Sequence, residues 1–446
     1  MYIIIIGAGD IGFNLAKILS YERHDIVIIE KNGENYQKAV ESLDAQVILG
    51  SGSSYKTLLH AGIRTADMLI AVSNSDEVNM LSALMAKQYG VKHTIARVSN
   101  LEFLDEESPI SQEKAEIDLL IHPESVAAQA AARLLKRSAA TDLIEFENGK
   151  IVLIGIQLDK TSPILNQKLS VLAKKFENIT FRTVAIQRNE TTRIPKGEDF
   201  FKVDDRIFVI VPKEFVKDVI RGAGKENVDI HNIMILGGGQ TGYLIAKELE
   251  NDFNIKIIES KADKSEVLAE NLSKSLVIKG DGRDINLLAL EGIIDMDAFI
   301  AVTGDDETNI VSSLMAKHLE VPRIIALINK TTYSPIIPTI GINAHISKQL
   351  LTVNAILKFI RRGSVVSVAS IPGISAEAIE LIPNVGSKIT KKPLKDIKFP
   401  KEAILGAVMR DNDVFIPIGD THIKAGDKVV LFALPSAIHD VEKMFN

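Results

Sequence analysis

Two glycine-rich loops carry the residues best suited to hold a phosphate group. GAGDIG occupies residues 7–12 and GGGQTG occupies residues 237–242. Each loop follows a short apolar run and opens a segment with one apolar face, which predicts a strand, a turn and then a helix. In such a loop the first glycine allows the tight turn, the second lets the backbone approach a pyrophosphate, and the third lets helix and strand pack closely. A phosphate would bind the unpaired N–H groups at the positive end of the helix.

An acidic residue follows each loop, at the end of the next predicted strand. Glu30 holds this position in the first copy and Glu259 holds it in the second. A carboxylate there accepts hydrogen bonds from a ribose diol and repels a 2′-phosphate, which favours NAD or an adenosine nucleotide over NADP. The alternative is a fold of the same type that has lost its ligand and keeps its glycines for packing.

The ends of later strands supply further candidate contacts. Ser51 and Asp281 follow the third predicted strands, near the place of an adenine, although an Asp beside glycine also suits a simple turn. Arg97 ends the fifth strand, where it could reach a phosphate or form a surface ion pair. Leu327 stands at the matching place in the second copy.

Four polar residues follow the fourth predicted strands. Ser73 and Thr303 end these strands, and Asp76 and Asp306 lie just beyond them. Such side chains commonly cap the free N–H groups of a helix, so helix caps are favoured over ligand contacts. The predicted nucleotide-binding residues are Gly7, Gly9, Asp10, Ile11, Gly12, Glu30, Ser51, Ser73 and Arg97 in the first copy, and Gly237, Gly239, Gln240, Thr241, Gly242, Glu259, Asp281 and Thr303 in the second.

The elements that position these residues occur twice at one offset. DMLIAVSNSDEVNMLSALMAK (67–87) matches DAFIAVTGDDETNIVSSLMAK (297–317), and AQVILGSG (45–52) matches SLVIKGDG (275–282). A repeat this long indicates duplicated domains, because solenoid repeats are much shorter. In each copy apolar strands alternate with amphipathic helices, which predicts a parallel sheet with helices on both faces. The predicted strands of the first copy are 2–6, 26–30, 46–49, 68–72 and 93–97.

A weaker repeat follows each copy. IPKGEDFFKVDDRIFVIV (194–211) resembles IPIGDTHIKAGDKVVLFA (416–433), and each reads as strand, polar loop, aspartate and strand. The predicted fold class is therefore α/β, with two Rossmann-type doubly wound parallel-sheet domains, each followed by a small α+β domain. The predicted boundaries are 1–138 and 230–360 for the Rossmann-type domains and 139–222 and 364–446 for the small domains, with a linker around 222–229.

Two predicted helices carry long apolar faces. They cover residues 124–137 and 350–360, at the end of each Rossmann-type copy. Such a face either packs inside its own domain or pairs one Rossmann-type domain with another, within the chain or between chains.

Composition limits what the chain can do. A formal net charge of −6 argues against nucleic acid as the main partner, because phosphate binding needs a basic face. The absence of cysteine excludes disulfides, thiolate chemistry and Cys-ligated metal. The chain opens on a predicted strand without a basic leader, and no apolar run approaches the ~20 residues that span a bilayer. We therefore expect a cytoplasmic protein without a metal site that reaches a membrane only through another protein.

Residues for acid–base catalysis are not evident. A dehydrogenase needs an acid or base at its substrate, yet His60 is matched by Leu290, and no HExxH, GxSxG or His cluster stands out. The GKS/GKT phosphate loop is also absent. The pattern favours binding without catalysis. An NAD-dependent oxidoreductase, with one catalytic and one structural copy, is the alternative.

The whole pattern resembles the TrkA family of regulatory subunits of Trk-type potassium uptake, built from tandem RCK (KTN) domains. The resemblance rests on the two glycine loops with Glu30 and Glu259, on GDG at 280–282, and on AVSNSDEVN (71–79) and AVTGDDETN (301–309). It implies a peripheral protein on the inner face of the cell membrane that forms a homo-oligomeric ring, usually a tetramer, and docks on an integral membrane potassium-transport subunit. Bound NAD(H) and ATP or ADP would change the ring and gate potassium uptake.

Two points remain open beside this resemblance. Ser51 departs from the Asp that is usual in the family, and a transporter that exports potassium or exchanges protons is an alternative partner.

We expect the two nucleotide sites to differ in the ligand that they prefer. Arg97 adds positive charge to the first, which favours ATP or ADP, whereas Asp281 in the second could accept from an adenine amino group, which favours NAD(H).

Overall fold

A computed structural model of the chain describes residues 1–446 except 106, 137–139, 190, 226–228, 331, 335, 361–364, 372, 373 and 375. The predicted boundary at 138/139, the predicted start at 364 and part of the linker lie outside the described residues. The chain forms two compact units, one of residues 1–126 with 348–360 and one of 127–347 with 361–446. Among the described helices, none combines the length and apolar character that crossing a membrane requires.

The first unit contains a six-stranded parallel sheet in the order β3-β2-β1-β4-β5-β6. Its central strand is a run of isoleucines with almost no exposed surface, as expected where helices cover both faces. The order reverses between β1 and β4, which opens a crevice at the carboxyl ends of these strands. The elements are β1 Tyr2–Ile6, α1 Asp10–Tyr21, β2 Asp25–Glu30, α2 Gly33–Ser42, β3 Gln46–Leu49, α3 Tyr55–His60, β4 Met68–Ala71, α4 Asp76–Gln88, β5 His93–Arg97 and β6 Leu119–Ile121. Helix α5, Pro123–Lys136, begins in this unit and continues into the second.

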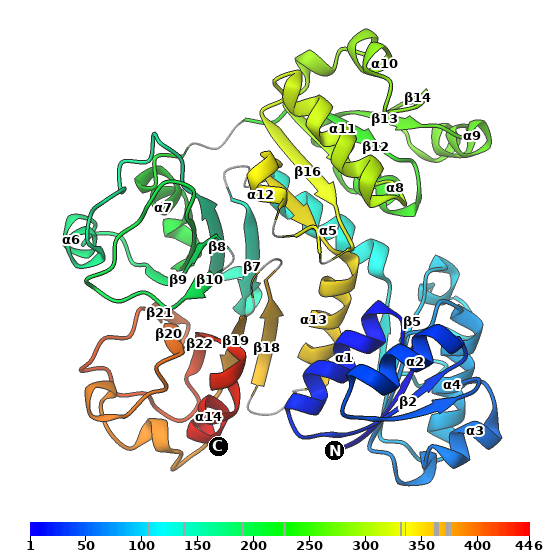
Figure 1. Cartoon of the computed structure of the whole chain (residues 1–446), viewed down its shortest axis with the longest axis horizontal. Coiled ribbons are helices and arrows are strands. Elements are labelled where there is room, and N and C mark those ends of the chain that lie inside the picture. Colours follow the sequence, from blue (N-terminus) through cyan, green and yellow to red (C-terminus); the bar gives the residue numbers. More distant parts are fainter. Residues whose placement is uncertain are drawn as a thin grey trace. The chain divides into compact units, whose positions relative to one another are not determined.

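The second unit contains a sheet of the same design, in the order β14-β13-β12-β15-β16-β17. Helices α8 and α11 lie along this sheet in Figure 1. The predicted fold class is confirmed, and the sixth strand of each sheet is an addition to the five strands predicted. The elements are β12 Asn232–Leu236, α8 Gln240–Leu249, β13 Asn254–Glu259, α9 Ala262–Asn271, β14 Leu276–Lys279, α10 Ile285–Leu290, β15 Ala298–Ala301, α11 Asp306–His318, β16 Arg323–Leu327, α12 Ile337–Ile340 and β17 Ala344–Ile346.

Two five-stranded antiparallel sheets complete the second unit, in the orders β10-β9-β11-β8-β7 and β18-β19-β22-β20-β21. Buried residues of both sheets share one core, which includes Phe208 and Phe432. The elements of the first small domain are β7 Asp142–Phe146, β8 Ile151–Gln157, α6 Leu169–Lys175, β9 Arg182–Arg188, β10 Thr191–Arg193, β11 Arg206–Pro212 and α7 Val216–Gly222. Those of the second are β18 Val365–Ser370, β19 Glu377–Leu381, β20 Ala403–Arg410, β21 Asp413–Phe415, β22 Lys428–Ala433 and α14 Pro435–Phe445.

The weaker sequence repeat was placed slightly wrongly on these sheets. Its last strand is observed in both copies as β11 and β22, but its first predicted strand is loop, because β10 and β21 end just before it. The repeated aspartate has a clear role. Asp205 accepts two hydrogen bonds of 2.7 Å from the guanidinium of Arg188, and Asp427 accepts two of 2.8 and 2.6 Å from Arg410. The first pair fastens the end of the polar loop to β9, and the second fastens it to β20.

Helix α13, Lys348–Ile360, packs beside α1 in the first unit (Figure 1). Val353, Ile356 and Leu357 are fully buried there, in one core with Leu15 and Leu19 of α1. The apolar face predicted at 350–360 therefore pairs with the Rossmann-type sheet of the first copy, within the same chain. This helix ends the second copy in sequence, so the two copies are interlocked.

A buried cluster of charged residues joins three elements of the second unit. Arg206 of β11 donates to the Asp142 carboxylate of β7, with its Nε at 2.9 Å, and both side chains are buried. Arg323 of β16 is also buried and donates to the carbonyl of Ala140, just after α5, at 2.7 Å. Burial lowers the pKa of Arg323 to about 9, although the Asp142 carboxylate acts in the opposite direction. The guanidinium is therefore still charged at neutral pH.

Candidate nucleotide-binding sites

The first and third glycines of each loop are required by the fold itself. Gly7 and Gly237 have φ angles of 98° and 107°, in the region that favours glycine. A Cβ on Gly12 would lie 1.9 Å from the carbonyl oxygen of Gly7, and a Cβ on Gly242 would lie 1.9 Å from that of Gly237. These four glycines would be needed whether or not a ligand binds.

The middle glycines are not explained by packing. A Cβ added to Gly9 or Gly239 would meet no heavy atom of the protein within 4 Å. Each is the N-cap of the following helix and has no side chain to cap it, unlike Ser75, which caps α4. The first turns of α1 and α8 therefore lack the N-cap side chain that commonly accepts from a helix N–H group. Open space at the positive end of a helix suits a pyrophosphate.

The residues that open these helices contribute unequally. Ile11 and Thr241 are buried, so their backbone N–H groups are the parts that can serve a ligand. The exposed Asp10 carboxylate accepts a hydrogen bond of 2.7 Å from Nε2 of Gln349, in α13. A hydrogen bond thus connects the start of α1 to α13, the helix that ends the second copy in sequence but packs in the first unit. Gln240 begins α8 at the matching position.

The two predicted ribose-binding acids have the same environment. Both Glu30 and Glu259 are buried at the ends of β2 and β13. One oxygen of Glu30 accepts from the N–H of Ala8 and the other accepts from the N–H of Asn32, at 2.6 Å. Glu259 accepts in the same way from Gly238 and Lys261, each at 2.9 Å.

These contacts give the carboxylates a second task. Each one holds its glycine loop against the end of the second strand. A carboxylate offers about four lone-pair directions, and two backbone donors occupy half of those of Glu30. At Glu259 the hydroxyl of Ser260 also donates, at 3.3 Å, beside the two backbone donors. The directions that remain can accept from the hydroxyls of a ribose.

In each copy one buried asparagine connects the ends of the fourth and fifth strands beside the glycine loop. The side-chain oxygen of Asn79 accepts from the N–H and the hydroxyl of Ser73, and its amide donates to the Arg97 carbonyl at 2.9 Å. Asn309 makes the same contacts with Thr303 and the Leu327 carbonyl. Ser73 and Thr303 are therefore positioned by an asparagine and do not cap a helix. Both asparagines lie in the repeated blocks 67–87 and 297–317, but the repeat alone did not predict which groups they would bind.

The helix-cap interpretation of Asp76 and Asp306 was also wrong. The N-caps of α4 and α11 are Ser75 and Asp305, one residue earlier in each case. The Asp76 carboxylate instead accepts two hydrogen bonds of 2.8 Å, from the N–H groups of residues 99 and 100. Asp306 does the same for residues 329 and 330. Both carboxylates shape the loop that follows the fifth strand.

The third strands end differently in the two copies. The hydroxyl of Ser51 lies 2.8 Å from that of Ser53, in a neutral polar turn. Both oxygens of Asp281 accept from the guanidinium of Arg283, at 3.0 and 2.8 Å, within an exposed turn. Hydrogen bonds from Arg283 lower the pKa of Asp281 to about 2. An adenine amino group would have to compete with Arg283 for this carboxylate.

The fifth strands also differ. Arg97 is the last residue of β5, and its Nη1 donates to the side-chain oxygen of Asn74 at 3.2 Å. Its Nε is buried and has no protein partner, so this guanidinium retains hydrogen-bonding capacity toward a ligand. Leu327, at the matching position, is fully buried and offers only its carbonyl to Asn309.

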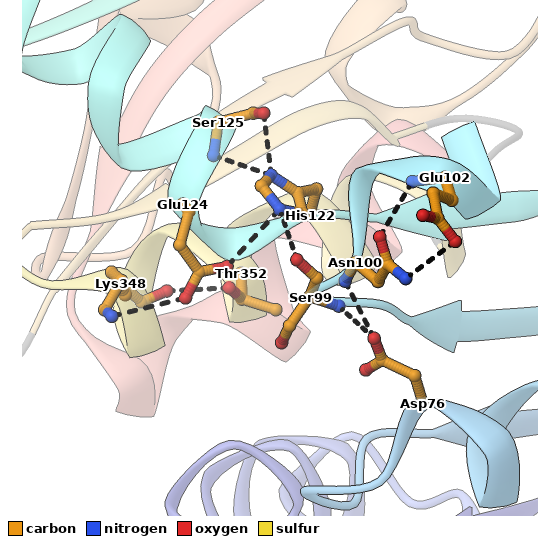
Figure 2. A network of polar contacts seen from close by, with 9 residues as sticks. All are labelled: Asp76, Ser99, Asn100, Glu102, His122, Glu124, Ser125, Lys348 and Thr352. Atoms are coloured by element: carbon orange, nitrogen blue, oxygen red, sulfur yellow. Dashed lines mark hydrogen bonds and ion pairs between the residues drawn. The ribbon is translucent and has the colours of Figure 1, made fainter. Parts of the chain in front are cut away.

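A polar network connects the first site to the borrowed helix α13 (Figure 2). The Ser99 segment, held by Asp76, presents its carbonyl to Nε2 of His122 at 3.0 Å. Nδ1 of the same ring lies 2.7 Å from the hydroxyl of Ser125, in the first turn of α5. Beside it Glu124 accepts from Nζ of Lys348, the first residue of α13, at 3.3 Å. His122 thus links the site edge to α5, and Glu124, whose Oε2 lies 3.8 Å from Nε2 of His122, links α5 to α13.

These features define a duplicated Rossmann-type fold of the kind that binds nucleotides, combined with two small antiparallel domains. The TrkA-N domain family model matches residues 3–123 and 233–348, and the TrkA-C domain family model matches residues 379–446. The chain belongs to the TrkA family. It is 36% identical to the Trk system potassium uptake protein TrkA homolog 2 of Methanosarcina mazei, over 100% of both chains. It is 34% identical to the TrkA protein of Halomonas elongata, over 100% of this chain and 98% of that one.

Solved structures show the same fold at lower identity. The RCK domain of GsuK is 17% identical and covers 100% of this chain and 94% of its own, with a TM-score of 0.60. The GsuK channel bound to NAD is 16% identical, with a TM-score of 0.61, and the match covers 100% of this chain and 78% of that one. The fold predicted from the repeats is thus that of RCK domains.

Proposed function

We propose that this protein is a regulatory subunit of a potassium-uptake system that binds adenine nucleotides at its two glycine loops. The observation that carries the proposal is the pair of open positions at Gly9 and Gly239, each beside a buried acid with lone pairs to spare. The relatives are named as Trk system potassium uptake proteins, and two structural neighbours are GsuK channels bound to NAD and to ADP. NAD(H) and ATP or ADP are the ligands that we assign to this chain.

We also propose a signalling role for α13. In the division that we propose, residues 1–138 and 230–360 would be the nucleotide-binding domains, and residues 139–222 and 364–446 would be the small domains. A ligand shifts a conformational equilibrium only by its different affinities for the two states. The contacts of Asp10 with Gln349 and of Glu124 with Lys348 would make the position of α13 depend on the state of the first loop. The signal would pass to an integral membrane potassium-transport subunit at the inner face of the membrane.

Replacing Glu259 with alanine tests the nucleotide sites. We expect the affinity for NADH or ADP at the second site to fall by about 10–100-fold, because a hydrogen bond to a charged group contributes roughly 1.5–3 kcal/mol. The glycine loop would also lose the acceptor of the Gly238 N–H, which adds to the effect. Isothermal titration calorimetry on the full chain measures both sites.

Glu250→Ala serves as the matched control for this substitution. Glu250 is buried in the same sheet domain and also accepts from a backbone N–H, but at residue 274. It should leave nucleotide affinity unchanged. Equal affinity in the Glu259→Ala variant and the native chain would remove the ribose role. Oxidation of NADH by the native chain with a carbonyl substrate would favour the oxidoreductase alternative instead.

Both copies expose apolar side chains on equivalent helices, which favours assembly of chains through these faces. Tyr55 of α3 and the matching Ile285 of α10 are 54% and 39% exposed, and Leu81 of α4 and the matching Val311 of α11 are each 45% exposed. Exposed apolar groups at corresponding positions suit repeated contacts in a symmetric oligomer. A tetrameric ring is the assembly that we propose.

Light scattering on the native chain is expected to give a mass near four chains. Replacing both Leu81 and Val311 with glutamate should lower this mass, because the charges would have to be buried without partners. Val385→Glu is the control, since Val385 is 91% exposed and lies in a loop of the second small domain. A monomeric native chain at micromolar concentration would contradict the ring.

A further inference from the structure

The first small domain contains a pocket of about 360 Å³ between α6, α7 and the antiparallel sheet. Its lining is mainly apolar and includes Ile164, Leu172, Phe176, Phe201, Ile207 and Val219. Protein interiors are normally packed without voids of this size, and a pocket of this volume falls within the range of small-ligand sites. The pocket is separate from both glycine loops.

The second small domain explains why this pocket is present. The repeat that aligns 194–211 with 416–433 continues into the last helix, where Val219 corresponds to Val441. Three residues further on, the second copy has Met444 and Phe445, and the first copy has Gly222 and Ala223.

The exchange of large for small residues leaves a space in the first copy. Met444 and Phe445 are buried in the core of the second small domain, where Phe445 has no exposed surface. Gly222 and Ala223 line the pocket of the first. The pocket is therefore lined at two positions where the duplicate domain has large, buried side chains.

The lining also indicates the chemistry of an occupant. Phe176 and Phe181 meet edge to face, with ring centroids 6.4 Å apart, and both contribute to the wall. The lining also includes one cationic residue, Lys196, and two anionic residues, Glu177 and Asp218. A fourth charged residue, Arg182, donates to the carbonyls of residues 405 and 417 at 3.3 and 2.7 Å, so its guanidinium is engaged with the second small domain. Charges of both signs together with aromatic side chains in the lining favour an uncharged apolar ligand over an ion.

We propose that this pocket is a binding site for a small uncharged aromatic or aliphatic molecule, distinct from the nucleotide sites. The ligand would replace the packing that Met444 and Phe445 supply in the duplicate domain. Its wall includes Ile404 of the second small domain, so an occupant would contact both small domains at once. A site with this placement can act as a second input to the protein, independent of whether nucleotides bind.

The test compares binding of indole to the full native chain and to chains in which the pocket is filled. The Gly222→Met/Ala223→Phe variant reproduces the second copy. A Cβ on Gly222 would lie 3.3 Å from Cε1 of Phe176, so that ring must shift. Ala223→Leu is a milder variant that avoids this contact. Circular dichroism and thermal melting establish that each variant is folded.

We expect saturable indole binding to the native chain by calorimetry, and at least about 10-fold weaker binding to both filled variants. Lys443→Met is the control, because it adds an apolar side chain to an exposed position of α14, the matching helix. It should bind indole as the native chain does. Lack of saturable indole or benzene binding by the native chain would overturn the proposal, as would equal indole affinity in the native chain and a folded filled variant.

Discussion

Replacing Gly239 with aspartate is expected to abolish nucleotide binding at the second site and to leave the first site intact. Gly9→Asp should have the converse effect. The added side chain would occupy the empty space in front of α8 or α1, where no protein atom lies within 4 Å of the new Cβ. It would also place a negative charge at the positive end of the helix, where a pyrophosphate must bind. Calorimetric titration of each variant with ATP and with NADH assigns a ligand to each site.

Alanine at the same positions separates the effect of charge from that of space. Since a Cβ fits without contact, Gly9→Ala and Gly239→Ala should fold normally and lose less affinity than the aspartate variants. We expect Gly9→Asp to lose ATP preferentially, because Arg97 ends β5 in the first copy and adds a positive charge that the second copy lacks at Leu327. Loss of both ligands in equal proportion from both variants would show that Arg97 and Asp281 do not select the nucleotide.

The parallel sheets and glycine loops could be predicted because their signals are local. A strand of isoleucines followed by GAGDIG specifies strand, turn and helix without reference to the rest of the chain. The duplication then provided a second, independent instance of each motif. The third glycine illustrates this well, since Gly12 and Gly242 are both forced by the same 1.9 Å approach to a carbonyl.

The interlocking of the two copies could not be predicted, because an amphipathic helix records that one face is buried and not what covers it. Residues 350–360 carry the apolar face, and only the structure places it on α1. The helix cap was predicted at the wrong residue because residue type does not fix the exact start of a helix. Asp76 and Ser75 are both good caps by residue type, and a one-residue difference decided which side chain reached the helix N–H groups.

Asp281 shows how a neighbour can change the meaning of a candidate residue. Its position at the end of the third strand suggested an adenine contact, and its type suggested a turn. The structure pairs it with Arg283, two residues away. The sequence shows that the two residues are close along the chain, but it does not show that their side chains meet. Whether ATP or NADH displaces Arg283 is measured by the affinity of the Arg283→Ala variant.

The buried charged cluster of the second unit leads to the largest expected loss of stability. Asp142→Ala should reduce the free energy of unfolding by about 3–5 kcal/mol, because it leaves the buried Arg206 guanidinium without its carboxylate. Arg323 lies in the same cluster and has a buried Nε without a hydrogen-bond partner, so the site would then hold two uncompensated cations. This loss is a large fraction of the stability of a typical domain. Since several domains unfold separately, hydrogen exchange in β7, β8 and β11 is a better measure than one global midpoint.

The double substitution Asp142→Leu/Arg206→Met distinguishes loss of a charge partner from loss of packing. Replacing both members of a buried pair with apolar residues of similar size is often neutral or stabilising, so this variant should recover most of the protection lost in Asp142→Ala. Glu198→Ala removes an exposed ion pair with Lys168 from the same small domain and should leave exchange in β7 unchanged. If Asp142→Ala exchanges like the native chain, the carboxylate does not stabilise this cluster. If the double variant exchanges as fast as Asp142→Ala, the shape of the side chains rather than their charge determines the lost protection. The contact between the first small domain and Arg323 must then be explained by packing alone.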